Sequence, residues 1–148
     1  QGAQRHKGYV QALQESGIPY DPENVIWFHT EDRKTKPSLM LSMLLDSKKS
    51  VDAAVCYNDQ IALAVISMLE EKGISVPEDL SVTGFDDNIY ARLSRPMLTT
   101  VRQKPEEKGK EAVGLLMRRI YGEEVPVGRM RLPTELIVRE SVRNLADR

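Results

Sequence analysis

The sequence alternates short apolar runs with longer segments of helical periodicity, and this alternation constrains the fold more than any other feature. Apolar runs at 24–28, 51–57 and 80–85 suit buried strands, and the segments 37–45 and 59–72 between them repeat apolar residues at helical spacing. Strands separated by helices of this length pair in parallel through right-handed crossovers. We therefore predict an α/β fold, in which a parallel sheet is flanked by helices in three layers.

The two ends of the chain extend this pattern. The chain opens inside an amphipathic helix that ends at Gly17. A further short strand is expected at 98–101, and a helix follows over 105–121, with proline and acidic residues in its first turn and arginines in its last. The apolar residues of this last helix form one stripe that needs a surface to cover. Residues 130–132 and 135–138 then suit strands.

The segment 59–72 is apolar on almost every side. A helix of this kind is buried all round. One side should lie on the sheet, and the other side meets either a larger core or a second subunit. We place the dimer interface of a homodimer here and in the segment that follows the third predicted strand, at Ile61, Val65, Met68 and Ile89.

Charge and cysteine content exclude several classes of protein. The chain has 148 residues, with 21 basic against 22 acidic side chains and a net charge of −1. Residues 51–100 carry only three basic but eight acidic side chains, and phosphate binding needs clustered basic residues on one face, so this chain should not bind DNA itself. No apolar run reaches the ~18 residues of a membrane span. The single cysteine, Cys56, suits a reducing compartment, and we expect a cytoplasmic protein.

The sequence offers no recognisable set of catalytic or metal-binding residues. The two histidines, His6 and His29, are far apart and have no carboxylate or cysteine at the spacing of a metal site. The triplet that begins at Gly109 resembles the end of a phosphate loop, but the upstream glycine is absent and the triplet lies inside a predicted helix. We expect neither an enzyme nor a bound metal or cofactor.

Polar side chains follow three of the predicted strands at their carboxyl ends, namely Asn58, Asp86 and His29. Open α/β sheets bind ligands at this edge. Each position also has a structural explanation, because Asn58 or Asp59 can cap the next helix and Asp86 or Asp87 can cap a short helical turn. We assign the capping roles to Asp59 and Asp87, and leave Asn58 and Asp86 to point into a cleft.

Three long motifs resemble a known family. The run YNDQIALAVISMLEEKGISVPEDLSVTGFDD at 57–87, the segment LTTVRQ at 98–103 and the segment PTELIVRES at 133–141 resemble the effector-binding half of the lactose/galactose/ribose repressor family. The opening QRHKGYVQAL is similar to that family's Arg-x-x-Gly helix. The combination VCYNDQIAL, TEDRKTK and GFDD resembles the arabinose-repressor branch, in which such a sensor is joined to a winged-helix DNA-binding domain.

The resemblance implies a periplasmic-binding-protein-like sensor that holds a sugar between two α/β lobes. Four sugar-binding positions of that family have matching residues in this sequence. Arg5 matches the arginine that binds sugar hydroxyls, Asn58 the asparagine before the dimer helix, Asp86 the first aspartate of the Gly-aromatic-Asp-Asp motif, and Gln103 the glutamine after Thr-Thr-Val. By position alone, Arg5 would be a solvated surface residue and Gln103 a loop residue.

The family also stacks an aromatic ring on the sugar from the loop near residue 30. The candidates here are Trp27, Phe28 and His29. We expect Trp27 in the core instead, and count His29 among the ligand-binding residues.

The resemblance divides the chain into three parts. Residues 1–103 correspond to the C-terminal lobe, residues 104–132 to a helix and strand that belong with the other lobe, and residues 133–148 to a returning strand and tail. The resemblance implies the sugar-sensing and dimerising part of a bacterial repressor that a small sugar such as arabinose releases, with DNA bound only through an absent N-terminal domain. The alternative is a periplasmic sugar-binding protein of the transport type.

Overall fold

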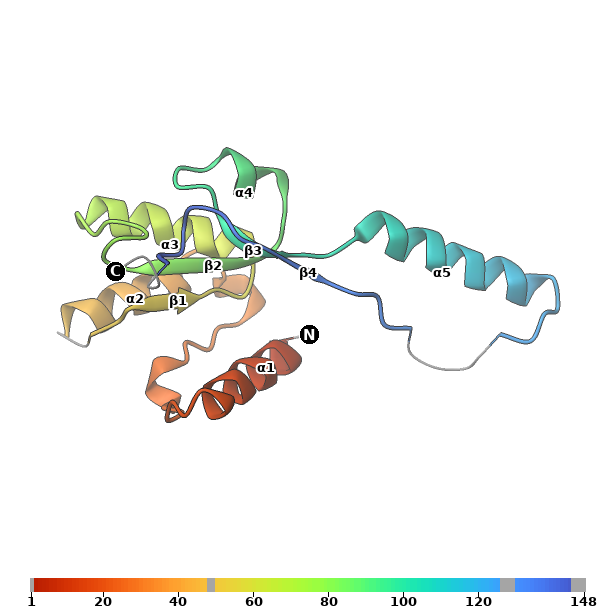
Figure 1. Cartoon of the computed structure of the whole chain (residues 1–148), viewed down its shortest axis with the longest axis horizontal. Coiled ribbons are helices and arrows are strands. Elements are labelled where there is room, and N and C mark those ends of the chain that lie inside the picture. The colour runs from red at the N-terminus through yellow and green to blue at the C-terminus, as the bar shows by residue number, and fades with distance from the viewer. Residues whose placement is uncertain (1, 48–49, 126–129, 145–148) are drawn as a thin grey trace.

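The computed structural model describes residues 2–47, 50–125 and 130–144 and contains one four-stranded sheet in the order β1-β2-β3-β4. Helices alternate with strands along most of the chain (Figure 1). The elements are α1 (Gly2–Glu15), η1 (Pro22–Asn24), η2 (Thr30–Asp32), α2 (Lys36–Asp46), β1 (Ala53–Val55), α3 (Asp59–Glu71), β2 (Ser81–Asp86), α4 (Ile89–Leu93), β3 (Thr99–Arg102), α5 (Pro105–Ile120) and β4 (Glu135–Ile137).

The sheet is parallel in its first three strands and antiparallel in its last. β1 pairs with β2 and β2 with β3 in parallel, which confirms the predicted arrangement. β4 pairs antiparallel with β3, with Thr100 opposite Ile137. The reason is visible in Figure 1, because the chain leaves the sheet at the end of β3, runs out along α5 and returns from the same side.

Helices cover both faces of the sheet. A side chain at Gly84 in β2 would collide with Asp59 of α3, so α3 lies against this face. The ring of the next residue, Phe85, points to the opposite face because side chains alternate along a strand. There it lies under the guanidinium of Arg5 from α1, 3.7 Å from ring centroid to Cζ. The three layers are therefore α3, the sheet and α1.

The core lies between α3 and the sheet. It contains Leu41, Ile61, Ala62, Val65, Ile66, Leu69, Leu80, Val82, Ala91 and Leu98. Ile61 and Val65 are only 5% and 2% exposed. Two of the residues that we predicted at a dimer interface therefore belong to the core of this chain, because the apolar character of the helix at these positions is used against the sheet.

Two predicted strands are wrong. Residues 25–29 and 130–134 have no strand structure, and Trp27 and Met130 are 60% and 51% exposed. A strand needs a neighbour to pair its backbone N–H and C=O groups. Neither segment belongs to the sheet of the described residues, and the amide of Val25 donates instead to the carbonyl of Pro22. The apolar pattern identified segments that suit burial, but the described chain offers them no partner.

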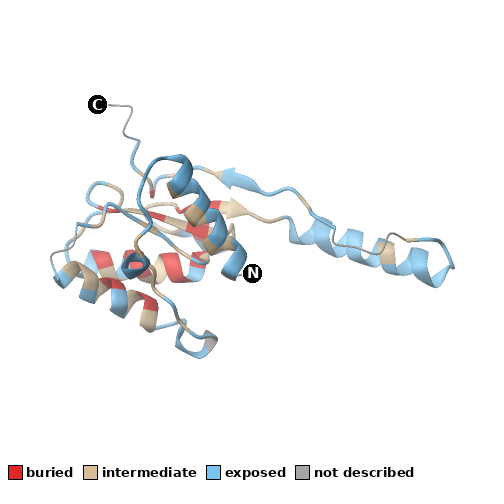
Figure 2. Cartoon of the chain, turned by 90° about the horizontal axis from the view of Figure 1, so that it is seen from below, coloured by how far each residue is buried: buried red, intermediate tan, exposed pale blue. Residues whose placement is uncertain are grey.

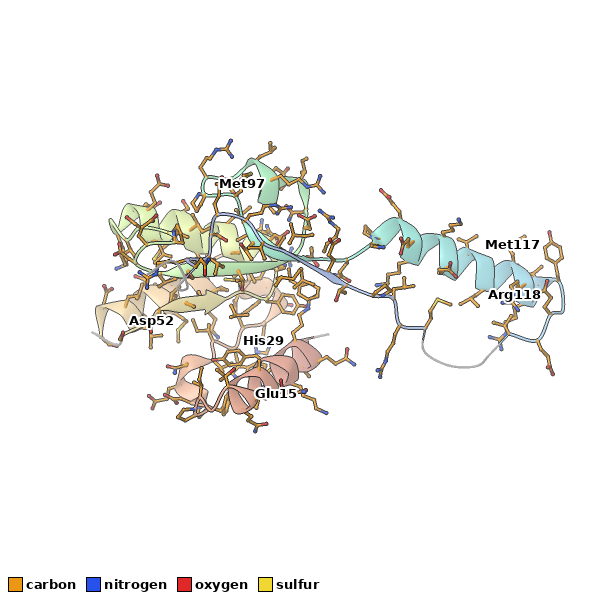
Figure 3. The ribbon with its side chains drawn as sticks, viewed as in Figure 1. Glu15, His29, Asp52, Met97, Met117 and Arg118 are labelled. Atoms are coloured by element: carbon orange, nitrogen blue, oxygen red, sulfur yellow. The ribbon has the colours of Figure 1, made fainter. Side chains whose placement is uncertain are left out.

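The helix α5 projects away from the rest of the molecule (Figure 1). It has no buried residue, and pale blue covers nearly its whole length in Figure 2. Figure 3 shows Met117 and Arg118 far from Asp52 and Met97 in the body. The apolar stripe predicted for this helix is therefore exposed, with Val113 at 59%, Leu116 at 57% and Ile120 at 65%. Within the described ranges, no helix combines the length and apolarity that crossing a membrane requires.

Candidate functional site

Three of the predicted ligand residues meet at the carboxyl end of β2. Gln103, directly after β3, donates from Nε2 to Oδ1 of Asp86 at 2.7 Å. Arg5 of α1 approaches the same oxygen, with Nη2 at 3.9 Å. Residues separated by 98 positions in the sequence thus lie around one carboxylate. The side chain of Asp86 is 41% exposed and can accept further hydrogen bonds.

The guanidinium of Arg5 is fixed by two rings and a carbonyl. Its Cζ lies 3.7 Å from the centroid of the Phe85 ring and 4.5 Å from that of Tyr57. Such cation–π contacts are favourable, and Arg5 also donates from Nη1 to the carbonyl of Tyr57. The sequence interpretation missed Tyr57 and Phe85. Both directly precede predicted ligand residues, Asn58 and Asp86, and this adjacency is the signal that could have found them.

Asn58 has the capping role that we gave to its neighbour. Its Oδ1 accepts from the amide of Ile61 at 3.0 Å, which makes Asn58 the N-cap of α3. Asparagine is among the preferred residues at this position. The cap uses one of the two lone pairs of Oδ1, and the Nδ2 amide of Asn58 can still donate to a ligand. Asn58 follows β1 and lies next to Tyr57, whose carbonyl binds Arg5.

Asp59 and Asp87 are not caps, and this part of the prediction is wrong. Asp59 is fully buried and accepts from the backbone amide of Asn88 at 2.8 Å and the hydroxyl of Thr100 at 2.5 Å. Asn88, not Asp87, caps the short helix α4. A buried carboxylate must be satisfied by donors from several elements, and these partners become visible only when distant strands come together.

The loop before α2 differs from the expectation at Trp27, while the role of His29 as a ligand residue stays a prediction. Trp27 is 60% exposed rather than in the core, and its ring centroid lies 4.9 Å from that of His6. Phe28 packs edge to face against Tyr57 at 6.2 Å, which places it beside the Arg5 ring contacts. His29 is exposed, and its carbonyl accepts from the amide of Asp32. Of the three aromatic candidates, Phe28 is therefore the one that contacts Tyr57, whose ring also packs against Arg5.

The arrangement suits a ligand with several hydroxyl groups. A guanidinium donates, a carboxylate accepts, and amides do both, so adjacent hydroxyls can be bound by Arg5, Asp86 and Gln103 together. Asp86 and Gln103 also line an open depression with Pro105 and Lys108. Over residues 2–47, 50–125 and 130–144, no cluster of three or more histidine, cysteine or acidic residues could hold a metal ion.

A cluster of arginines surrounds the neighbouring carboxylate, Asp87. Its side chain is 1% exposed and accepts from Arg139 at 2.5 Å, from Arg102 at 2.6 Å and from Arg92 at 3.3 Å. Burial by itself would raise the pKa of the Asp87 carboxyl, but the hydrogen bonds and charges of Arg139 and Arg102 lower it overall. Hydrogen bonds from cations favour the charged form, which explains this direction.

Acid should remove the stabilisation that Asp87 provides. Because the pKa of Asp87 in the folded chain lies below its ordinary value of 3.8, its contribution is complete above that value and is lost as the pH falls through the folded pKa. We expect Asp87→Asn to lower the free energy of unfolding at pH 7 and to differ much less from the unmodified chain near pH 2. Urea unfolding followed by circular dichroism measures this.

The matched control is Asp46→Asn, since Asp46 is a surface residue whose partner among the described residues is Lys72. Exposed pairs contribute about 0–1 kcal/mol, so this variant should follow the unmodified chain at every pH. An Asp87→Asn deficit that is the same at pH 7 and pH 2 would contradict the assignment.

Comparison with known proteins identifies a family. A model of the periplasmic binding protein-like domain matches residues 1–142. The chain is 34% identical over 148 residues to the arabinose metabolism transcriptional repressor of Geobacillus stearothermophilus, covering 98% of this chain and 41% of that protein. It is 37% identical over 141 residues to the transcriptional repressor CytR of Escherichia coli, covering 95% of this chain and 41% of that protein. The chain thus spans about two fifths of the length of these curated relatives.

Solved structures agree with this result. The transcriptional regulator CelR in complex with cellobiose matches with a TM-score of 0.85 at 36% identity, over 95% of this chain and 42% of that one. A LacI-family regulator from Enterococcus faecium with bound ribose matches with a TM-score of 0.78 at 31% identity, over 93% of this chain and 50% of that one. Both similarities extend over nearly the whole described fold.

Proposed function

Since this chain belongs to the family of periplasmic binding protein-like domains, we propose that it is the sugar-sensing and dimerising part of a bacterial transcriptional regulator. The observation that carries the proposal is the meeting of Arg5, Asp86 and Gln103 at the carboxyl edge of the sheet. Open α/β sheets bind their ligands at this edge. The three side chains come from separate elements, so a local capping or surface role does not explain their convergence.

The structure and the relatives favour a regulator over a transport protein or an enzyme. The relatives described above are named as transcriptional repressors, and the structures with cellobiose and ribose are transcriptional regulators. These proteins are not enzymes. We propose a small sugar as the effector of this chain, with arabinose as the first candidate because of the Geobacillus relative. DNA would be bound through a separate domain, and the regulator would act in the cytoplasm.

We propose that the chain is divided between two lobes: residues 1–103 belong to one lobe, 104–132 pack on a second lobe, and 133–148 return to the first. The support is the exposed stripe of α5 together with the return of β4 to the edge of β3. An amphipathic helix needs a surface for its apolar side. Residues 126–129 and 145–148 of these segments lie outside the described residues.

A panel of sugars tests the proposed effector class. The chain can be joined to the first lobe of the Geobacillus repressor, and the melting temperature of this two-lobed protein measured with pentoses and hexoses. A ligand that binds only the folded state raises the melting temperature. We expect at least one sugar, with L-arabinose tested first, to do so in a concentration-dependent way. A folded two-lobed protein that responds to no sugar would contradict the proposal.

We also propose that the chain forms a homodimer through α4 and the outer side of α3. Ile89, Tyr90 and Leu93 on α4 are 60%, 65% and 67% exposed. Met68 on α3 is half-buried, so it and Ile89 remain in the proposed interface while Ile61 and Val65 do not. Exposed apolar residues that adjoin one another mark association surfaces. A two-fold axis would place the same patch on both subunits.

The dimer prediction separates the surface from the core. Ile89→Glu with Leu93→Glu should convert the dimer to folded monomers, as measured by sedimentation velocity together with circular dichroism. Ile61→Glu should instead unfold the chain, because placing an unpaired carboxylate in the core costs several kcal/mol, on the order of 3–5. An unmodified chain that stays monomeric at high concentration would exclude this interface.

A further inference from the structure

The arginine cluster around Asp87 has no role in the proposed ligand contacts, yet it lies directly beside them. Asp86 faces Gln103, while the next residue, Asp87, faces Arg102, which precedes Gln103 on β3. Two consecutive residues at the end of β2 are therefore bound to two consecutive residues at the end of β3. The Asp86 side chain is 41% exposed, whereas that of Asp87 is only 1% exposed.

The backbone between the two aspartates is held in an unfavourable conformation. Asp86 has a φ of 121° and Asp87 a φ of 52°. Residues other than glycine rarely adopt positive φ, and they keep it only where the surroundings fix them. Arginines hold the Asp87 carboxylate in place: Oδ2 accepts from Arg102 and Oδ1 accepts from Arg139. Loss of these bonds would free the Asp87 side of this segment, one residue away from the carboxylate that accepts from Gln103.

The cluster also includes the chain segment that returns from α5. Arg139, two residues after β4, donates from Nη2 to Asp87 and from Nη1 to the carbonyl of Leu98 at 2.7 Å. Arg102 has a second partner in Glu135, at the start of β4, at 3.3 Å. The position of the returning strand is therefore linked to the carboxylate that fixes Asp86.

We propose that Asp87 is a positioning residue for the ligand site: through Arg139 and Arg102 it holds Asp86 in contact with Gln103. The proposal rests on the proposed function for the role of Asp86 as a sugar ligand. The arrangement itself is a property of the chain without sugar, so it can be tested separately.

The test uses the side-chain amide of Gln103 as a reporter in a ¹⁵N–¹H correlation spectrum of the 148-residue chain. The signal is assigned by its loss in Gln103→Glu. In Asp87→Asn we expect the signal to move to the position of a solvated glutamine and its protons to exchange faster with water. Arg139→Lys keeps the charge but replaces the two guanidinium nitrogens that bind Asp87 and Leu98 with a single ammonium nitrogen, so we expect a smaller change in the same direction.

Arg92→Gln is the matched control, since Arg92 is the most exposed and most distant of the three arginines, at 54% and 3.3 Å. It should leave the Gln103 signal in place. A change of stability alone does not move a signal of the folded state, so the readout separates positioning from a structural role. Arg139→Lys carries the test if Asp87→Asn does not fold. An unmoved Gln103 signal in either folded variant overturns the proposal, whether or not the two-lobed protein binds sugar.

Discussion

Asp86→Asn should weaken the binding of L-arabinose to the two-lobed protein by about tenfold to a hundredfold. The Asp86 carboxylate is exposed at the site and already accepts from Gln103, so a sugar hydroxyl can donate to its remaining lone pairs. Hydrogen bonds to charged groups contribute about 1.5–3 kcal/mol, and each 1.4 kcal/mol corresponds to about a factor of ten in affinity. Isothermal titration calorimetry measures the change.

Asp46→Asn provides the comparison for this substitution. It removes the same charge from a surface residue whose described partner is Lys72, so the affinity for sugar should not change. Equal affinities for Asp86→Asn and the unmodified protein would remove Asp86 from the site.

Gly84→Ala should strongly destabilise the chain. A methyl group at this position would lie 2.3 Å from Oδ1 of Asp59, 2.8 Å from the side chain of Leu98 and 3.2 Å from the Cα of Asp59. Asp59 cannot turn away without losing its buried hydrogen bonds to Thr100 and Asn88. Overpacking costs about 1–3 kcal/mol, and an unsatisfied buried group adds about 1–3 kcal/mol. Thermal unfolding should show a melting temperature lower by roughly 10 °C.

Gly109→Ala is the control for the glycine substitution. Gly109 lies in α5, and beyond its chain neighbours and the backbone of its own helix no atom of the described residues lies within 4 Å of the added methyl group. Alanine is a better helix former than glycine by up to about 1 kcal/mol, so this variant should be as stable as the unmodified chain or slightly more stable. If the melting temperature of Gly84→Ala lies within about 2 °C of that of the unmodified chain, α3 can move away from the sheet at a small cost in free energy, and the prediction is wrong.

Local patterns predicted most of the helices and strands of the described chain. The helices α2, α3 and α5 and the strands β2 and β3 agree with their predicted segments to within about two residues, which is the usual uncertainty of an element boundary. The signals that predicted them are local: apolar spacing, a proline at a helix start and a glycine after a helix end each depend on only a few neighbouring residues. The strands predicted at 24–28 and 130–132 failed because a strand also needs a pairing partner, and periodicity does not show whether one is available.

The candidate site could be predicted only in part, for a similar reason. The carboxyl ends of parallel strands indicated Asn58 and Asp86, and the resemblance to a family added Arg5 and Gln103. The division of roles between neighbouring aspartates depended on contacts across 15 to 52 residues of sequence, such as those of Asp87 with Arg102 and Arg139. Capping rules describe one turn of helix, so they could not distinguish Asp87, held by arginines, from Asn88, which caps α4.

We propose that the sugar is bound between this lobe and a second one, and titration of the 148-residue chain with L-arabinose tests this most directly. On an open surface each hydrogen bond competes with water and contributes only about 0.5–1.5 kcal/mol, before the loss of translational and rotational freedom is subtracted. We predict that the chain alone does not saturate up to millimolar sugar, whereas the two-lobed protein saturates well below that concentration. Tight, saturable binding by the chain alone would contradict the account.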